Sequence, residues 1–114
     1  MLPEVKSLLV DIQHAVAGVD LFTAGKSRDD FKGDLMLRRA VERQFEIIGE
    51  AMNRLRKIDP LLTDRISEYR GIISFRNVLI HGYDKINDDV TWQIIEKRLP
   101  ILRIEIDELV TGLK

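Results

Sequence analysis

The sequence contains no cysteine among its 114 residues. Disulfide bonds, thiolate zinc sites and cysteine nucleophiles are therefore excluded, and a reducing compartment is the natural setting, so we expect a cytoplasmic protein. Long apolar runs are also missing, because nowhere do about 18 apolar residues follow one another without a charge. The N-terminus has no basic start followed by an uninterrupted apolar stretch. The sequence thus predicts a protein that neither spans a membrane nor is exported.

The sequence also lacks a large excess of charge of either sign, since the formal net charge is −1. This value excludes the global basic field that draws proteins onto nucleic acid without specificity. The charges are unevenly distributed, however. Residues 38–76 hold nine Arg and Lys against six Asp and Glu, whereas residues 1–37 and 77–114 each carry a balance of −2. The middle of the chain is therefore its electropositive part.

What is present is typical of one helical domain. A chain of this length supports a single hydrophobic core, so we predict that residues 1–114 form one domain. Hydrophobic residues make up 45% and charged residues 32% of the chain, a mixture typical of amphipathic helices. No internal repeat and no strand-like alternation are visible. The predicted fold class is all-α, as a four- to five-helix up-down bundle.

Apolar residues recur at spacings of three and four along most of the chain, which predicts helices. We expect helices over residues 3–23, from just after Gly33 to Ile58, over a short segment that begins at Pro60, over residues 68–80, and from Asp88 or Asp89 through Leu109.

Glycine and proline mark the irregular points of this pattern. Residues 24–30 contain Gly25 and are expected to form a connection. Gly82 suits the left-handed conformation that follows many helices. Pro100 is expected to kink the last helix without breaking it. Gly49 lies in the middle of a predicted helix, where close approach of the helix that carries residues 68–80 would compensate for its low helix propensity.

Some predicted helices carry more apolar residues than one buried face needs. Ile47 lies beside Ile48, and Ile101 lies beside Leu102. These pairs indicate a second buried face, and therefore a homodimer.

Three other groups of residues are predicted to have structural and not catalytic roles. Glu42, Glu46 and Glu50 lie four apart with arginines nearby, which favours a solvated ion-pair face over a metal site. Phe45 and Trp92 fall on apolar stripes and are predicted to be core residues. His14 has no second ligand at a matching spacing and is interpreted as an ordinary helical residue.

The candidate general acid or base is His81, because imidazole is the side chain whose ordinary pKa lies near neutrality. Asn77 lies four residues before it and shares its helix face, whereas Arg76 lies about 140° around the helix, an offset that a long guanidinium can partly close. A guanidinium offers paired donors to phosphate oxygens, an imidazole moves protons, and an amide orients either group. Together these groups suit phosphodiester chemistry.

The spacing of Arg76 and His81 is weak evidence by itself in a chain with eleven arginines. The neighbours make the pattern specific: Asn77 follows the arginine, Gly82 and Tyr83 follow the histidine, and a helix is predicted to end there. Residues 76–83 resemble the motif of the HEPN superfamily, and within it of the HepT-like toxins of the MntA/HepT type, which is Arg, four residues, His, any residue, Tyr. Residues 39–51, which include the segment Ile-Gly-Glu-Ala, look like that family's long second helix.

The resemblance implies a metal-independent endoribonuclease without a cofactor, active on RNA as a homodimer in which the two motifs face each other across a cleft. Arg76 and His81 would be catalytic, with Asn77 and Tyr83 in supporting roles. The partner would be an MntA-like nucleotidyltransferase antitoxin that silences the toxin by transferring AMP onto Tyr83. A non-catalytic HEPN module that binds a nucleotide or a protein is the alternative, and a purely structural dimerisation domain is a third interpretation.

Overall fold

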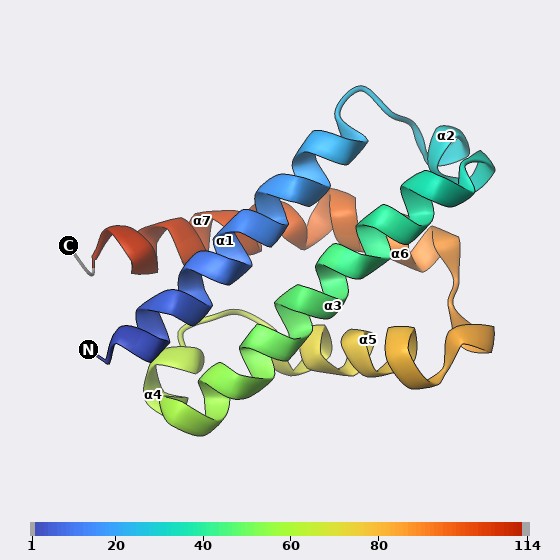
Figure 1. Ribbon diagram of the computed structural model, residues 1–114. Coiled ribbons are helices and arrows are strands. Elements are labelled where there is room, and N and C mark those ends of the chain that lie inside the picture. The colour runs from blue at the N-terminus through green and yellow to red at the C-terminus, as the bar shows by residue number, and fades with distance from the viewer. Residues whose placement is uncertain (1, 113–114) are drawn as a thin grey trace.

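The computed structural model describes residues 2–112, and over this range the chain forms helices joined by turns (Figure 1). The elements are α1 (Pro3–Thr23), α2 (Arg28–Gly33), α3 (Leu35–Ile58), α4 (Pro60–Thr63), α5 (Tyr69–His81), the 3₁₀-helix η1 (Tyr83–Lys85), α6 (Asp88–Lys97) and α7 (Leu99–Thr111). The predicted all-α class is confirmed for the described residues. The predicted count of four to five helices is wrong, because α2 and the division of the last helix add to it.

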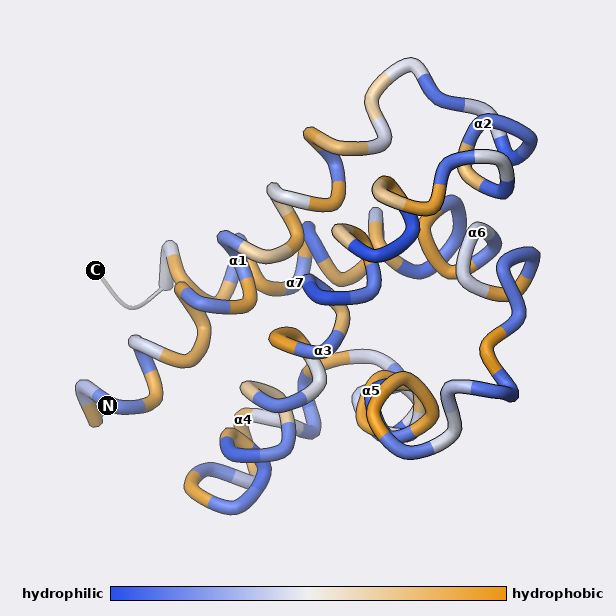
Figure 2. The backbone as a smooth tube through the Cα atoms, turned by 45° about the vertical axis from the view of Figure 1, so that its right-hand side comes forward, coloured by the Kyte–Doolittle hydropathy of each residue, from blue (hydrophilic) through white to orange (hydrophobic). Residues whose placement is uncertain are grey.

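The two longest helices, α1 and α3, run antiparallel and lie side by side (Figure 1). α7 packs on α1, and α5 packs on α3, so α3 is the central element that positions α5. Polar and apolar residues alternate along the turns of these helices, as expected of helices that bury one face (Figure 2). The buried residues of α3 are Leu37, Val41, Glu42, Phe45, Ile48, Gly49, Ala51, Met52 and Leu55.

The sequence predicts residues 24–30 to be a connection, but α2 already begins within them at Arg28. Ser27 forms a capping box in which its hydroxyl accepts from the backbone N–H of Asp30, and the Asp30 carboxylate accepts from the backbone N–H of Ser27. The helix then buries Phe31 completely, with its ring 5.4 Å from that of Trp92. A helix of six residues depends on such tertiary packing for its stability.

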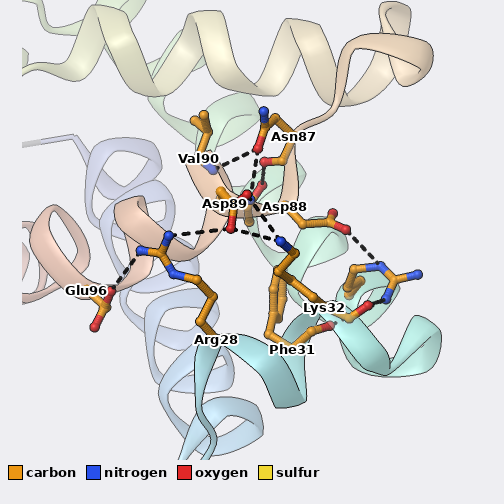
Figure 3. A network of polar contacts seen from close by, with 10 residues as sticks. Arg28, Phe31, Lys32, Asn87, Asp88, Asp89, Val90 and Glu96 are labelled. Carbon is orange, nitrogen blue, oxygen red and sulfur yellow. Dashed lines mark hydrogen bonds and ion pairs between the residues drawn. The ribbon is translucent and has the colours of Figure 1, made fainter.

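Ion pairs surround this contact between α2 and α6 (Figure 3). Asp89 lies between Arg28, at 3.4 Å, and Lys32, at 3.2 Å, and Arg28 also reaches Glu96 at 3.7 Å. The side chain of Asn87 caps α6 by accepting from the backbone N–H groups of its first turn. Because exposed ion pairs contribute about 0–1 kcal/mol each, the burial of Phe31 contributes more than these charges to holding α2 in place.

The cap of α2 makes a pH dependence testable. The backbone N–H of Ser27, and then its hydroxyl, lower the pKa of the Asp30 carboxyl below its ordinary value. Since the folded state favours the ionised carboxylate, the cap stabilises the fold at pH values above the unfolded pKa, and this contribution is lost as the pH falls through the lowered pKa. An NMR titration of Asp30 should give a midpoint below that of an unfolded peptide. The Ser27→Ala variant should raise this midpoint part of the way back toward the peptide value. A midpoint at or above the peptide value would contradict the cap.

Gly82 does not adopt the left-handed conformation that the sequence predicts, since its φ is −120° and its ψ 45°. Its N–H donates to the carbonyl of Val78, and its own carbonyl accepts from the N–H of Lys85. The chain therefore passes directly from α5 into η1, and no reversal of hand is needed. Among the described residues, positive φ occurs at Gly25 and at Glu68, the residue before α5.

Two helices, α6 and α7, replace the single kinked helix expected around Pro100. Arg98 separates them, although its φ of −95° and ψ of −40° remain in the right-handed helical region. Pro100 has no N–H, so the carbonyl of Glu96 lacks the partner it would have in a continuous helix. The proline instead takes one of the first positions of α7, where a missing N–H is tolerated.

The predicted core residues Phe45 and Trp92 are buried, which confirms their structural interpretation. Of the two apolar pairs, Ile48 and Leu102 are buried in the core. Their neighbours are not, since Ile47 is half-buried and Ile101 is 43% exposed. An apolar surface is thus left over, while the homodimer itself stays a prediction. Within the described range, none of the helices combines the length and apolarity needed to cross a membrane.

Candidate active site

α3 and α5 approach each other closely at Gly49. A Cβ atom built on Gly49 would lie 2.2 Å from the Cβ and 2.7 Å from the Cγ of Arg76, and 3.3 Å from the carbonyl oxygen of Ile72. The first two distances are far below van der Waals contact, so only glycine allows α5 to approach this closely. The expectation that Gly49 serves close packing against the helix over residues 68–80 is confirmed, and the packing partner is Arg76 itself.

Arg76 extends its guanidinium along the surface of α3. Its Nη2 donates to Oε2 of Glu50 at 2.6 Å, and its Nη1 donates to Oδ1 of Asn77 at 2.9 Å. The Nε atom is buried and has no hydrogen-bond partner among the described residues. Only 21% of the side chain is exposed. The guanidinium is therefore oriented by two partners and presents a small part of its surface to solvent.

Glu50 is a member of this site that the sequence predicts only as part of a solvated ion-pair face. Its second oxygen, Oε1, accepts from Nε of Arg54 at 3.0 Å, so the carboxylate lies between two guanidiniums. The contact with Arg76 joins residues far apart in the chain, which helix spacing cannot reveal. The one sequence signal for it is the mid-helix glycine directly before Glu50.

The ion pairs expected on α3 are present, but their solvation is not uniform. Glu42 pairs with Arg39 at 2.9 Å and Glu46 pairs with Arg43 at 3.6 Å. Glu42 is only 6% exposed, which corrects the prediction of a fully solvated face. The apolar face of α3 is wide because it packs on both α1 and α5, and Glu42 falls within it.

Arg76 lines a groove of about 290 Å³ between α1, α3 and α5. Three arginines and three carboxylates contribute to it, over a floor of apolar side chains. The lining residues are Leu8, Asp11, Arg43, Glu46, Ile47, Glu50, Ala51, Arg54, Arg76 and Ile80. The three positive and three negative formal charges of the groove sum to zero. Its local electrostatic potential therefore depends on which of these side chains form ion pairs with one another.

His81 is the last residue of α5, as predicted, and it is exposed. Its imidazole has no hydrogen-bond partner among the residues that the structure describes, and it lies outside the lining of the groove. It lies five positions after Arg76, which corresponds to about 7.5 Å along the helix axis. The structure thus joins Arg76 and Asn77 through a hydrogen bond, whereas His81 lies further along the helix and is exposed to solvent.

Tyr83 begins η1, directly beyond the end of α5, and is 80% exposed. It lies two residues after His81 and outside the packed core. Its phenolic group is therefore accessible to a large reagent. His14, by contrast, lies on the exposed side of α1, within a helix that does not contribute to this motif.

The motif that resembles the HEPN superfamily thus lies on α5 and at the start of η1. The family described as "Ribonuclease HepT-like" matches residues 12–109. The chain therefore belongs to the HepT-like ribonuclease family.

Individual relatives agree with this assignment over nearly their whole length. Two proteins of Methanocaldococcus jannaschii, each named "Putative RNase", are 30% and 32% identical to this chain, covering 97% and 91% of it and 91% and 94% of their own lengths. "Probable ribonuclease HepT" of Thermococcus cleftensis is 31% identical over 91% of this chain and 94% of its own. No solved structure is significantly similar to the chain.

Proposed function

We propose that this protein is a metal-independent endoribonuclease that acts as the toxin of a toxin–antitoxin pair. The observation that carries the proposal is the placement of the family's motif: Arg76 is fixed at a groove, and His81 is exposed at the end of the same helix. A guanidinium matches the geometry of phosphate oxygens, and an imidazole transfers protons near neutral pH.

Cleavage of RNA without a metal ion requires two proton transfers and stabilisation of charge at phosphorus. A base removes the proton of the ribose 2′-hydroxyl, the 2′-oxygen attacks the adjacent phosphorus, and the bond to the 5′-oxygen breaks as that oxygen takes up a proton. The products are a 2′,3′-cyclic phosphate and a 5′-hydroxyl. In this proposal His81 transfers a proton, Arg76 holds the phosphate, and Asn77 orients the guanidinium.

A homodimer would supply what one chain lacks. One imidazole cannot easily serve as acid and base in the same step, so His81 of a second copy would take the other role. Two features support this part of the proposal. Ile80, beside the histidine, is 41% exposed, and the groove carries equal numbers of cationic and anionic groups, which suits a self-complementary two-fold contact.

Silencing is proposed to act through Tyr83, whose exposure suits a bulky modification. A nucleotidyltransferase antitoxin would form a bond between the phenolic oxygen and the α-phosphorus of ATP, with release of pyrophosphate and loss of the phenolic proton. The attached AMP adds a negative charge and an adenosine two residues from His81. It would exclude RNA by its bulk and compete with RNA phosphate for Arg76.

The test is cleavage of single-stranded RNA by the purified chain in excess EDTA. We expect cleavage to proceed at the same rate as without the chelator, and mass spectrometry of the fragments to show 2′,3′-cyclic phosphate ends. Cleavage that stops in EDTA and returns with a divalent cation would contradict metal independence.

Silencing at Tyr83 is tested by modifying the purified chain. After incubation with ATP and a nucleotidyltransferase encoded beside it, the chain should gain one AMP on Tyr83 and lose cleavage activity. The Tyr83→Phe variant should cleave RNA at the same rate before and after this incubation, because it lacks the phenolic oxygen that accepts AMP. If the unmodified chain binds ATP or a protein partner but cleaves no RNA with or without metal, the non-catalytic HEPN module would be the better description.

A further inference from the structure

Glu50 contacts the candidate catalytic arginine across the boundary between two helices. Its Oε2 accepts from Nη2 of Arg76 at 2.6 Å, which is short for a charge-assisted hydrogen bond, and its Oε1 accepts from Arg54. The Glu50 side chain is 38% exposed and that of Arg76 21%. The pair is therefore partly shielded from solvent, and it joins α3 to α5 at the edge of the groove.

The surroundings leave the guanidinium little freedom. The absence of a side chain at Gly49 lets the stem of Arg76 lie directly against α3, and Asn77 accepts from Nη1 on the other side. Of the guanidinium nitrogens, Nη1 and Nη2 each have one partner and Nε is buried. The remaining N–H groups of Nη1 and Nη2 are the ones available to a phosphate, and their direction is set by the contact with Glu50.

We propose that Glu50 is a positioning residue that holds the guanidinium of Arg76 in the orientation required for the transition state of RNA cleavage. This inference rests on the proposed function. The carboxylate lies between Arg54 and Arg76, so the three groups together keep one positive charge to offer to a phosphate. Fixing the guanidinium before the substrate arrives removes the entropic cost of ordering it during the reaction.

The kinetic test uses Glu50→Gln, which keeps the size of the side chain and removes its charge. We expect kcat to fall roughly 10- to 100-fold, because small misplacements of a catalytic group have effects of this size, and KM to change less than about twofold. In an Arg76→Lys background the same substitution should cause no further loss, because Glu50 acts through the guanidinium. An unchanged kcat, or an equal loss in the Arg76→Lys background, would overturn the proposal.

The matched control is Asp20→Asn. Asp20 also joins two helices, α1 and α7, by accepting two hydrogen bonds from Arg103 at 2.8 and 2.9 Å, with a side-chain exposure of 39%. It lies outside α5 and the groove that Arg76 lines. We expect Asp20→Asn to lower the melting temperature about as much as Glu50→Gln while leaving kcat unchanged.

A second readout separates this inference from the proposed function. Because Nε of Arg76 is buried, its N–H should exchange slowly with solvent in the wild type. We expect Glu50→Gln to accelerate this exchange at least about tenfold and Asp20→Asn to leave it unchanged. If Arg76→Ala and His81→Ala both leave RNA cleavage intact, the proposed function fails, and the exchange rate still decides whether Glu50 holds Arg76. If those variants are inactive but Glu50→Gln alters neither kcat nor exchange, only the positioning role fails.

Discussion

The His81→Ala variant is expected to cleave single-stranded RNA about 10²- to 10⁴-fold more slowly than the wild type, which is the usual contribution of a positioned acid or base. Arg76→Ala should lower the rate about 10²- to 10³-fold, the range for losing a group that stabilises charge in the transition state. His81 is exposed and has no hydrogen-bond partner among the described residues, so its loss should leave the melting temperature nearly unchanged. The measurement is single-turnover cleavage of a labelled RNA with circular dichroism of each variant.

The control for this experiment is His14→Ala. His14 is the second histidine of the chain, exposed on α1 and remote in sequence from the motif. It should cleave RNA at the wild-type rate, which shows that the effect belongs to the end of α5 and not to any imidazole. Wild-type cleavage by the His81→Ala variant would contradict the proposed mechanism.

Gly49→Ala is the substitution with the largest expected effect on the fold. The new methyl group would meet the Cβ and Cγ of Arg76 at 2.2 and 2.7 Å. These atoms lie at the base of the side chain, so the clash cannot be relieved by rotating a flexible end, and α5 must move away from α3. Overpacking of this kind costs about 1–3 kcal/mol, while the better helix propensity of alanine returns only about 1 kcal/mol. Stability should therefore fall, and RNA cleavage should fall with it because Arg76 is displaced.

Gly71→Ala provides the opposite case within α5. A Cβ atom built on Gly71 meets nothing within 4 Å, so alanine gains helix propensity without a clash. Denaturant unfolding should show Gly71→Ala to be up to about 1 kcal/mol more stable than the wild type and Gly49→Ala to be less stable. Equal stability of the two variants would show that the helices separate at no cost, which is incompatible with the close contact at Gly49.

The long helices could be predicted from the sequence because each buries one regular face. The expected helix over residues 3–23 matches α1, and the expected end at Ile58 matches α3, where Pro60 disfavours helical geometry at Asp59. α2 was beyond reach of periodicity, since six residues do not complete two turns. Its stability depends on the contact of Phe31 with Trp92, a pairing of residues about half the chain length apart.

The site was accessible to sequence reasoning only where its signals are local. Arg76, Asn77, His81 and Tyr83 form one short motif, and the structure places them at the end of one helix and the turn that follows. Glu50 was not predicted as part of it, because its pairing with Arg54 one turn away already accounted for its charge. The contact with Arg76 exists only once α3 and α5 are packed together.

The buried Nε of Arg76, which has no partner among the described residues, has a consequence for evolution and engineering. Leaving a buried donor unsatisfied generally costs about 1–3 kcal/mol, which offsets part of what the hydrogen bonds of Arg76 to Glu50 and Asn77 contribute to stability. Selection for thermal resistance alone should therefore constrain position 76 only weakly, and such libraries should contain molecules that have lost their activity. A stabilised variant of this protein is best obtained with position 76 held constant and the search directed elsewhere.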